Sequence, residues 1–254
     1  MIKDTSDYFN QKAKSCEFNA TDSWIVLDPL EYSLQQKIES IGIPLKDWDI
    51  HINYGIKTGF NEAFIISDEV KESLIKEDPH SAEIIRPILR GRDIKRYNYN
   101  FASKYIITTF PAMHYDINDF PAIKKYLLSF DKRRLEQSGI KKIDGVNGFN
   151  ARKRSNNKWF ETQDNINYWR DFYKQKIIWG EISDRTKFCL DCNGEYFCEA
   201  TTFIMTGPSL KFLLCYLNSS LVSIPVRKFI SGAPVPLRRF CQYALNRLPA
   251  QVCL

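Results

Sequence analysis

Long apolar runs are missing from this 254-residue sequence, and no stretch approaches the roughly 20 apolar residues that a membrane-spanning helix requires. The N-terminal stretch MIKDTSDYFNQKAKSCEF also lacks the apolar core of a secretory signal. We therefore expect a cytoplasmic protein without a membrane partner. With 44% apolar and 26% charged residues, the composition is typical of a globular chain rather than a disordered one.

Histidine is scarce, and the three that are present, His51, His80 and His114, lie far apart. The sequence also lacks the Gly-x-Gly-x-x-Gly, Walker, Gly-x-Ser-x-Gly and His-Glu-x-x-His motifs. These absences exclude the enzyme classes that such motifs mark, and the sequence indicates no catalytic residue and no metal site. Whether the chain is an enzyme is left open.

The seven cysteines are odd in number and widely scattered, which favours reduced thiols over a disulfide framework. Cys189, Cys192 and Cys198 form C-x2-C-x5-C, which is half of a zinc pattern. No clear fourth ligand accompanies them. Thiols on strands are therefore the favoured interpretation, and zinc is the alternative.

Local patterns predict many short strands interrupted by a few helices. The stretch DPLEYSLQQKIESIG predicts a helix over residues 28–41, with Asp28 as its cap, Pro29 at its first position and Gly42 at its end. Further expected elements are strands within 48–54, 104–110, 175–180 and 187–205 and helices over 118–138 and 209–220. A short helix capped by Ser67 or Asp68 is expected as well. This succession predicts an α+β fold, with a mixed or antiparallel β-sheet and several helices.

In the stretch NYGIKTGFNEAFII, residues 53–66, a Gly-Ile-Lys-Thr-Gly turn separates the strand expected within 48–54 from a further expected strand, EAFII, at 62–66, and this predicts a hairpin-like connection. Gly55 and Gly59 would supply the positive φ angles of such a turn. An Asn193-Gly194 pair likewise predicts a turn between two strands of the second half.

Residues 48–97, WDIHINYGIKTGFNEAFIISDEVKESLIKEDPHSAEIIRPILRGRDIKRY, resemble the start of the TaqI-like C-terminal specificity domain. That domain is the target-recognition region of adenine-N6 DNA methyltransferases and of fused type II restriction-modification enzymes. GIKTGFNEAFII together with RPILRGRDI is a specific pair of motifs. The resemblance continues in FPAIKKYL, KIIWGEIS, KFCLDCNGEYFCEATTFIM and LKFLLCYLNSSLV.

The resemblance implies a module that recognises a sequence in double-stranded DNA, clamps the duplex and sets the target site. The chain has no Asn-Pro dipeptide, so the motif with which the family's catalytic domain holds the flipped adenine is missing. We therefore expect the chemistry and the S-adenosylmethionine to belong to a separate methyltransferase domain or subunit, with no cofactor in this chain. Residues 1–23 would be a linker remnant and residues 24–254 the recognition domain, with the option of two sub-blocks, 24–140 and 159–254, joined by the basic loop 141–158.

The formal net charge of +6 suits a polyanion partner if the cations gather on one face. The loop sequence NARKRSNNKW combines cationic side chains with amides that can bind base edges. The glycine-flanked turn is a further candidate, for which a structural role is favoured over DNA contact, and so is the segment around Gly91, for which a salt-bridged surface and a phosphate contact are equally consistent with the sequence. The expected DNA-binding residues are Arg152, Lys153, Arg154, Asn156, Asn157, Lys158, Lys57, Thr58, Asn61, Arg92 and Lys95.

Two other functions remain open from the sequence. One is a protein-interaction module whose basic loop docks on acidic surfaces, and the other is a self-contained metal-dependent nuclease with an unfamiliar site.

Overall fold

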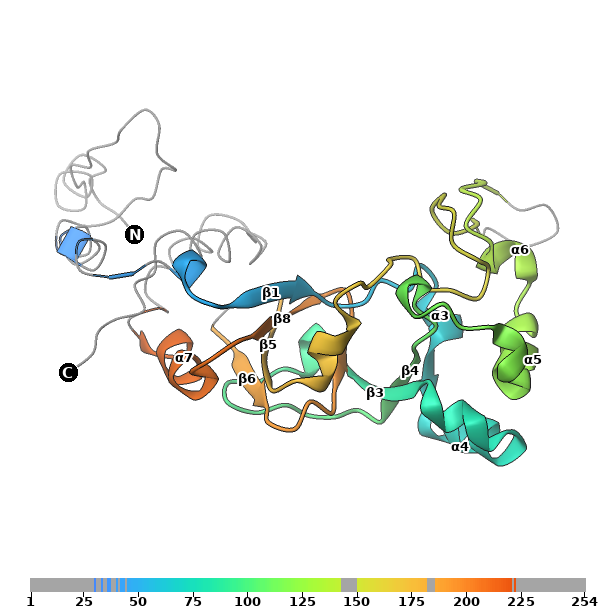
Figure 1. Cartoon of the computed structure of the whole chain (residues 1–254), viewed down its shortest axis with the longest axis horizontal. Helices are drawn as coiled ribbons and strands as arrows, with labels where there is room; N and C mark the ends of the chain where they lie inside the picture. Colours follow the sequence, from blue (N-terminus) through green and yellow to red (C-terminus); the bar gives the residue numbers. More distant parts are fainter. Residues whose placement is uncertain are drawn as a thin grey trace, which may run out of the picture. The chain divides into compact units, whose positions relative to one another are not determined.

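The computed structural model describes residues 30, 33, 36, 37, 40, 42, 43, 45–142, 150–181, 186–220 and 222. Its contacts divide the chain into two units, Ile50–Ser219 and a second unit made of Met1–Asp49 and Ser220–Leu254. Only the first unit is described nearly completely, and it contains all eight described strands (Figure 1). Most of the helix expected over residues 28–41 lies outside the described residues.

One sheet has the strand order β1-β8-β5-β6 and is antiparallel throughout. It is formed by β1 (His51–Tyr54), β8 (Thr202–Thr206), β5 (Lys176–Gly180) and β6 (Phe188–Asp191). Strand β1, from the first half of the chain, therefore pairs with β8, from the second half, with Ile52 opposite Met205.

The other sheet has the strand order β2-β4-β3-β7 and is mixed, because β3 and β7 run parallel while the other pairs are antiparallel. It consists of β2 (Ile65–Ser67), β4 (Lys104–Ile107), β3 (Ile85–Leu89) and β7 (Phe197–Cys198). Together the two sheets and the helices confirm the expected α+β class. The β1–β8 and β3–β7 pairs also join the expected sub-blocks 24–140 and 159–254.

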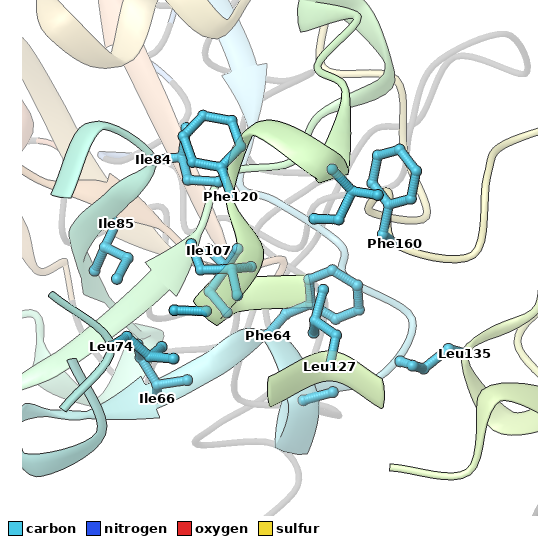
Figure 2. Close-up of a cluster of buried hydrophobic side chains, with 14 residues drawn as sticks. Phe64, Ile66, Leu74, Ile84, Ile85, Ile107, Phe120, Leu127, Leu135 and Phe160 are labelled. Carbon is cyan, nitrogen blue, oxygen red and sulfur yellow. The ribbon is translucent and has the colours of Figure 1, made fainter. Parts of the chain in front are cut away.

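Two apolar cores hold these sheets, and β4 contributes to both because successive side chains of a strand point to opposite faces. Ile106 is buried in the core shared by the two sheets, where it meets residues such as Ile178 and Phe197. Its neighbour Ile107 is buried in the second core, which lies against helices and includes Phe64, Leu127 and Phe160 (Figure 2).

The helices cover the apolar faces that the sheets leave open. Helix α4 (Asp68–Glu77) begins at Ser67, whose hydroxyl accepts a hydrogen bond from Val70 N, as its sequence predicts. Helices α4 and α5 (Pro121–Leu128) pack on each other, and α7 (Leu210–Leu217) packs on β5 and β6 (Figure 1). In the part of the chain that the structure describes, no helix is long and apolar enough to cross a bilayer.

The helix expected over residues 118–138 is interrupted. It forms the 3-10 turn Ile117–Asp119, then α5, and then the short α6 (Lys132–Leu135). Asp131 is extended, and its carboxylate accepts a hydrogen bond from Arg133 N, so it caps a new helix instead of continuing the first.

The expected hairpin-like connection at 53–66 is wrong, and the expected Asn193-Gly194 turn forms between two strands but does not pair them as a hairpin. The stretch 53–66 leads from β1 in one sheet to β2 in the other, and its expected strand begins instead as the helical turn α3 (Asn61–Phe64). The Asn193-Gly194 turn likewise leads from β6 in one sheet to β7 in the other. In both cases the turn chemistry is local, whereas the choice of strand partner is made by burial of residues far away in sequence.

Candidate functional site

The turn at Gly55 is hydrogen-bonded to the end of β7 and to the start of β8. Ile56 N donates to Cys198 O at 2.6 Å, and Gly55 N donates to Thr202 O at 2.8 Å. A Cβ at Gly55 would lie 1.9 Å from Glu199 O, so this glycine is needed for close backbone approach. The expected positive φ holds for Gly59, at 75°, and not for Gly55.

Next to this contact the surface is hollowed into an open pocket of about 690 Å³. We call it the basic groove, because five cationic side chains line it and only three acidic ones do. The cations are Arg90, Arg92, Lys95, Lys104 and Lys187, and the acids are Glu62, Glu181 and Glu199. Asn61 also lines the groove, so the structure brings together three of the expected DNA-binding residues, Asn61, Arg92 and Lys95.

The 3-10 turn η3 (Gly91–Asp93) positions the cations of one wall. One edge of the Arg90 guanidinium donates two hydrogen bonds to the Asp93 carboxylate, from Nε to Oδ2 and from Nη2 to Oδ1, each at 2.8 Å. Burial by itself raises the pKa of Asp93, but the hydrogen bonds and charge of Arg90 outweigh it and lower this pKa overall. The charge of Arg90 is thus balanced internally, whereas Arg92 and Lys95 are exposed.

Arg152, the first cation of the expected recognition loop, is not on the surface. Its side chain is 3% exposed. All five of its N–H groups donate to backbone carbonyls, which belong to Leu135, Thr58, Glu161 and Trp159, at 2.5–2.9 Å. Burial lowers the pKa of this guanidinium to about 10, so it stays protonated at neutral pH. The expectation that Arg152 contacts DNA is corrected, because its donors are fully used in tying the loop to the core.

The rest of the loop divides into an outer and an inner set. Lys153, Arg154, Asn156 and Lys158 are exposed. Asn157 is half-buried, and its amide donates to Thr162 O at 3.2 Å and Gln163 O at 3.0 Å. Four side chains of this loop therefore remain available to a partner, and one amide holds the loop's own shape.

The glycine-flanked turn divides in the same way. Lys57 is exposed, but Thr58 is completely buried. The Thr58 hydroxyl donates to Asn61 Oδ1 at 2.6 Å and accepts from Phe60 N. Thr58 is thus an internal hydrogen-bonding residue, which corrects the expectation that it contacts DNA.

Sequence reasoning missed Lys104, Lys187 and Glu199 as groove residues. Lys104 and Glu199 have no charged residue within three positions, and Lys187 is preceded by both an acid and a base, Asp184 and Arg185, so no basic cluster marks any of the three. The pairing of β4 beside β3 brings Lys104 to the groove, the return of the chain after β7 brings Glu199, and the pairing of β6 beside β5 brings Lys187, which precedes β6.

The half zinc pattern is divided between environments. Cys189 and Cys198 are buried in the core shared by the sheets, whereas Cys192 is exposed. Burial raises the pKa of Cys198 to about 12 and raises that of Cys189 even further. Among the residues the structure describes, no group of three or more His, Cys, Asp or Glu side chains is placed to hold a metal ion.

Two restriction enzymes are among the solved structures that align with this chain. The type IIL restriction-modification enzyme MmeI, solved in complex with DNA, aligns with 67% of this chain and 21% of its own, at 15% identity and a TM-score of 0.41. The type IIG restriction endonuclease BpuSI aligns with 75% of this chain and 22% of its own, at 12% identity and a TM-score of 0.42. The chain thus spans about a fifth of the length of these enzymes. No curated protein matches it.

A sequence match to one protein family covers more than half of the chain. It extends over residues 86–250, from β3 through the groove segments Gly91–Asp93 and 199–201 and beyond α7. The description of that family is the one that the motifs of the sequence already suggest. The chain belongs to the family of TaqI-like C-terminal specificity domains.

Proposed function

We propose that this chain is the sequence-specific, double-stranded DNA recognition module of a restriction-modification adenine-N6 DNA methyltransferase or endonuclease, acting in the cytoplasm. The observation that carries the proposal is the basic groove, in which Arg92, Lys95 and Asn61 meet Lys104 and Lys187 in a chain of this family. A separate domain or subunit, carrying S-adenosylmethionine, would perform methyl transfer.

The arrangement supports two kinds of DNA contact. Lysine and arginine neutralise phosphates and give salt-dependent affinity, while amides and carboxylates bind the edges of bases in the major groove. The exposed Lys153, Arg154 and Lys158 of the loop add a second cationic surface, which would extend the hold on the duplex backbone. The basic groove and the loop would together clamp the duplex against the catalytic domain.

The first test is selection from a randomised duplex pool at low salt, with sequencing of the retained DNA. We expect a short motif to be enriched. The double variant Arg92→Ala and Lys95→Ala should bind more weakly, and its dependence of log K on log salt should be shallower by about 1 for each phosphate that the variant no longer neutralises. Lys76→Ala, which removes one exposed cation of α4 outside the groove, is the control for the loss of a surface charge.

A second variant carries Lys153→Ala, Arg154→Ala and Lys158→Ala and tests the loop without disturbing buried Arg152. Loss of affinity without change of the motif would assign these cations to phosphates, and loss of the motif would assign them to bases. No retained DNA even at low salt would overturn the proposal in favour of a protein-interaction module. Metal-dependent cleavage by this chain alone would overturn it in favour of a nuclease.

A further inference from the structure

Glu199 places a carboxylate in a groove where cations prevail. Its side chain is half-buried, and it lies between the exposed surface and the backbone contact with Gly55. An acid in this position repels DNA phosphates and therefore weakens non-specific binding. Since this carboxylate weakens the binding of phosphates, its presence in a DNA-binding groove is explained only by a different contact with the DNA.

The hydrogen bonds that Glu199 accepts come from neutral groups, and two other charged residues of the groove are paired elsewhere. Glu62, another acid of the lining, pairs with Arg134 at 3.4 Å, and the guanidinium of Arg90 is bound to Asp93. Glu199 accepts from neutral donors, Asn61 Nδ2 at 2.7 Å and the Thr201 hydroxyl at 3.4 Å. The pKa of Arg90 is raised chiefly by its hydrogen bonds to Asp93, and the charge of Glu199 adds to this only as the last of the causes.

The orientation of the Glu199 carboxylate is fixed by Asn61 and, through it, by the buried Thr58. Asn61 donates to Glu199 through Nδ2 and accepts from the buried Thr58 hydroxyl through Oδ1, so its amide has a defined direction. The carbonyl of Thr58 in turn accepts from Arg152 Nη1 at 2.9 Å. A chain of hydrogen bonds therefore runs from Arg152 to Glu199.

The main chain at Glu199 is fixed as well. Glu199 N donates to Leu89 O at 2.9 Å, beside the parallel pair β3–β7. A carboxylate has about four acceptor sites, and the two bonds from Asn61 and Thr201 leave capacity for a further donor. The result is an acceptor that is oriented before any ligand binds, which lowers the cost of binding one.

We propose that Glu199, held by Asn61, is a specificity-determining residue that accepts a hydrogen bond from the exocyclic amino group of a cytosine or adenine in the major groove. Cytosine N4 and adenine N6 are the amino donors that the major groove displays, and glutamate is a known acceptor for such a group. The repulsion between Glu199 and phosphate then acts against sites that lack the amino group, which is how a specific site is separated from the rest. This inference rests on the proposed function.

The test compares Glu199→Gln with Glu72→Gln by pool selection on the full chain. Each variant removes one negative charge, but Glu72 lies on α4, outside the groove, and is 67% exposed. In Glu199→Gln the amide carbonyl can still accept from Asn61, so its NH2 group faces the groove as a donor. We expect the preference at one position of the motif to change from C or A to a base that displays an acceptor, G or T, by on the order of tenfold.

Asn61→Ala provides a second, independent variant. It leaves the charge of Glu199 in place but removes the amide that orients it, so discrimination at the same position should weaken. Glu72→Gln should retain the wild-type motif. Circular dichroism and thermal unfolding of each variant establish that the fold is kept.

The outcomes separate this inference from the proposed function. A wild-type motif that Glu199→Gln leaves unchanged overturns the role of Glu199 while the recognition function stands. Wild-type protein that retains DNA without any motif, or retains none, overturns both. A change of the preferred base at one position in Glu199→Gln, together with weaker preference at the same position in Asn61→Ala and an unchanged motif in Glu72→Gln, supports the assignment, and the wild-type base at that position is then the amino base that is read.

Discussion

Lys176 and Asp191 form an ion pair inside the molecule, with Nζ 2.5 Å from Oδ2 and the two side chains 0% and 2% exposed. The pair joins neighbouring strands β5 and β6, in which these residues lie opposite each other. Lys176 also donates to Phe172 O, and Asp191 accepts from the backbone N–H groups of Gly194, Glu195 and Tyr196. This network, rather than strand pairing, holds the turn that leads from one sheet to the other.

Lys176→Met should therefore destabilise the protein strongly. It leaves the Asp191 carboxylate buried without its cation, and removal of one partner of a buried pair costs about 3–5 kcal/mol. Lys174→Met is the matched control, because Lys174 forms an exposed pair with Asp171 at 2.8 Å and such pairs contribute about 0–1 kcal/mol. Urea unfolding measures both, and equal losses would contradict the structural importance of the buried pair.

Arg152→Lys should also destabilise, although the charge is kept. Lysine has three N–H donors where arginine has five, so at least two hydrogen bonds to the carbonyls around Arg152 are lost. We expect a decrease of about 3 kcal/mol in the free energy of unfolding. Arg154→Lys, an identical change at an exposed site of the same loop, should stay within about 0.5 kcal/mol. A small effect at both positions would refute the anchoring role.

Gly55→Ala should destabilise more than Gly91→Ala. The new Cβ would lie 1.9 Å from Glu199 O in the first case and 3.2 Å from Thr201 O in the second. Because the obstacle at Gly55 is backbone, the chain must move apart there, at a cost of about 1–3 kcal/mol or more. Thermal unfolding ranks the stability of the two variants. A larger loss in Gly91→Ala than in Gly55→Ala would show that the backbone at Glu199 can move away from residue 55 at little cost.

Acid should weaken the η3 wall of the groove. The pKa of Asp93 is lower in the folded protein than its usual 3.8, so its stabilising effect is complete above about pH 4 and is lost as the pH falls below 3.8 through the folded-state pKa. Asp93→Asn should remove this part of the pH dependence and reduce stability at pH 7. Urea unfolding between about pH 2.5 and 7 measures it. A wild-type-like acid dependence in the variant would mean that other carboxylates dominate.

Several parts of the fold and the site could be read from the sequence. Ser67 as a helix cap, the strands β4 and β5, the helix α7 and the exposed Lys153 and Lys158 follow from residue chemistry within a few positions. The motifs that suggest the family are also local, and the matching residues 86–250 bear out that resemblance. Arg92 and Lys95 belonged to the expected site and do line the groove.

Tertiary structure alone decided what those local pieces do. Arg152 and Arg154 have the same side chain two positions apart, yet one is buried and the other exposed, because the carbonyls that bind Arg152 come from segments up to 94 residues away. Glu199 joins Asn61 across 138 residues in the same way. Local sequence fixes caps, turns and alternation, whereas the partners of a buried donor depend on which apolar faces the whole chain brings together.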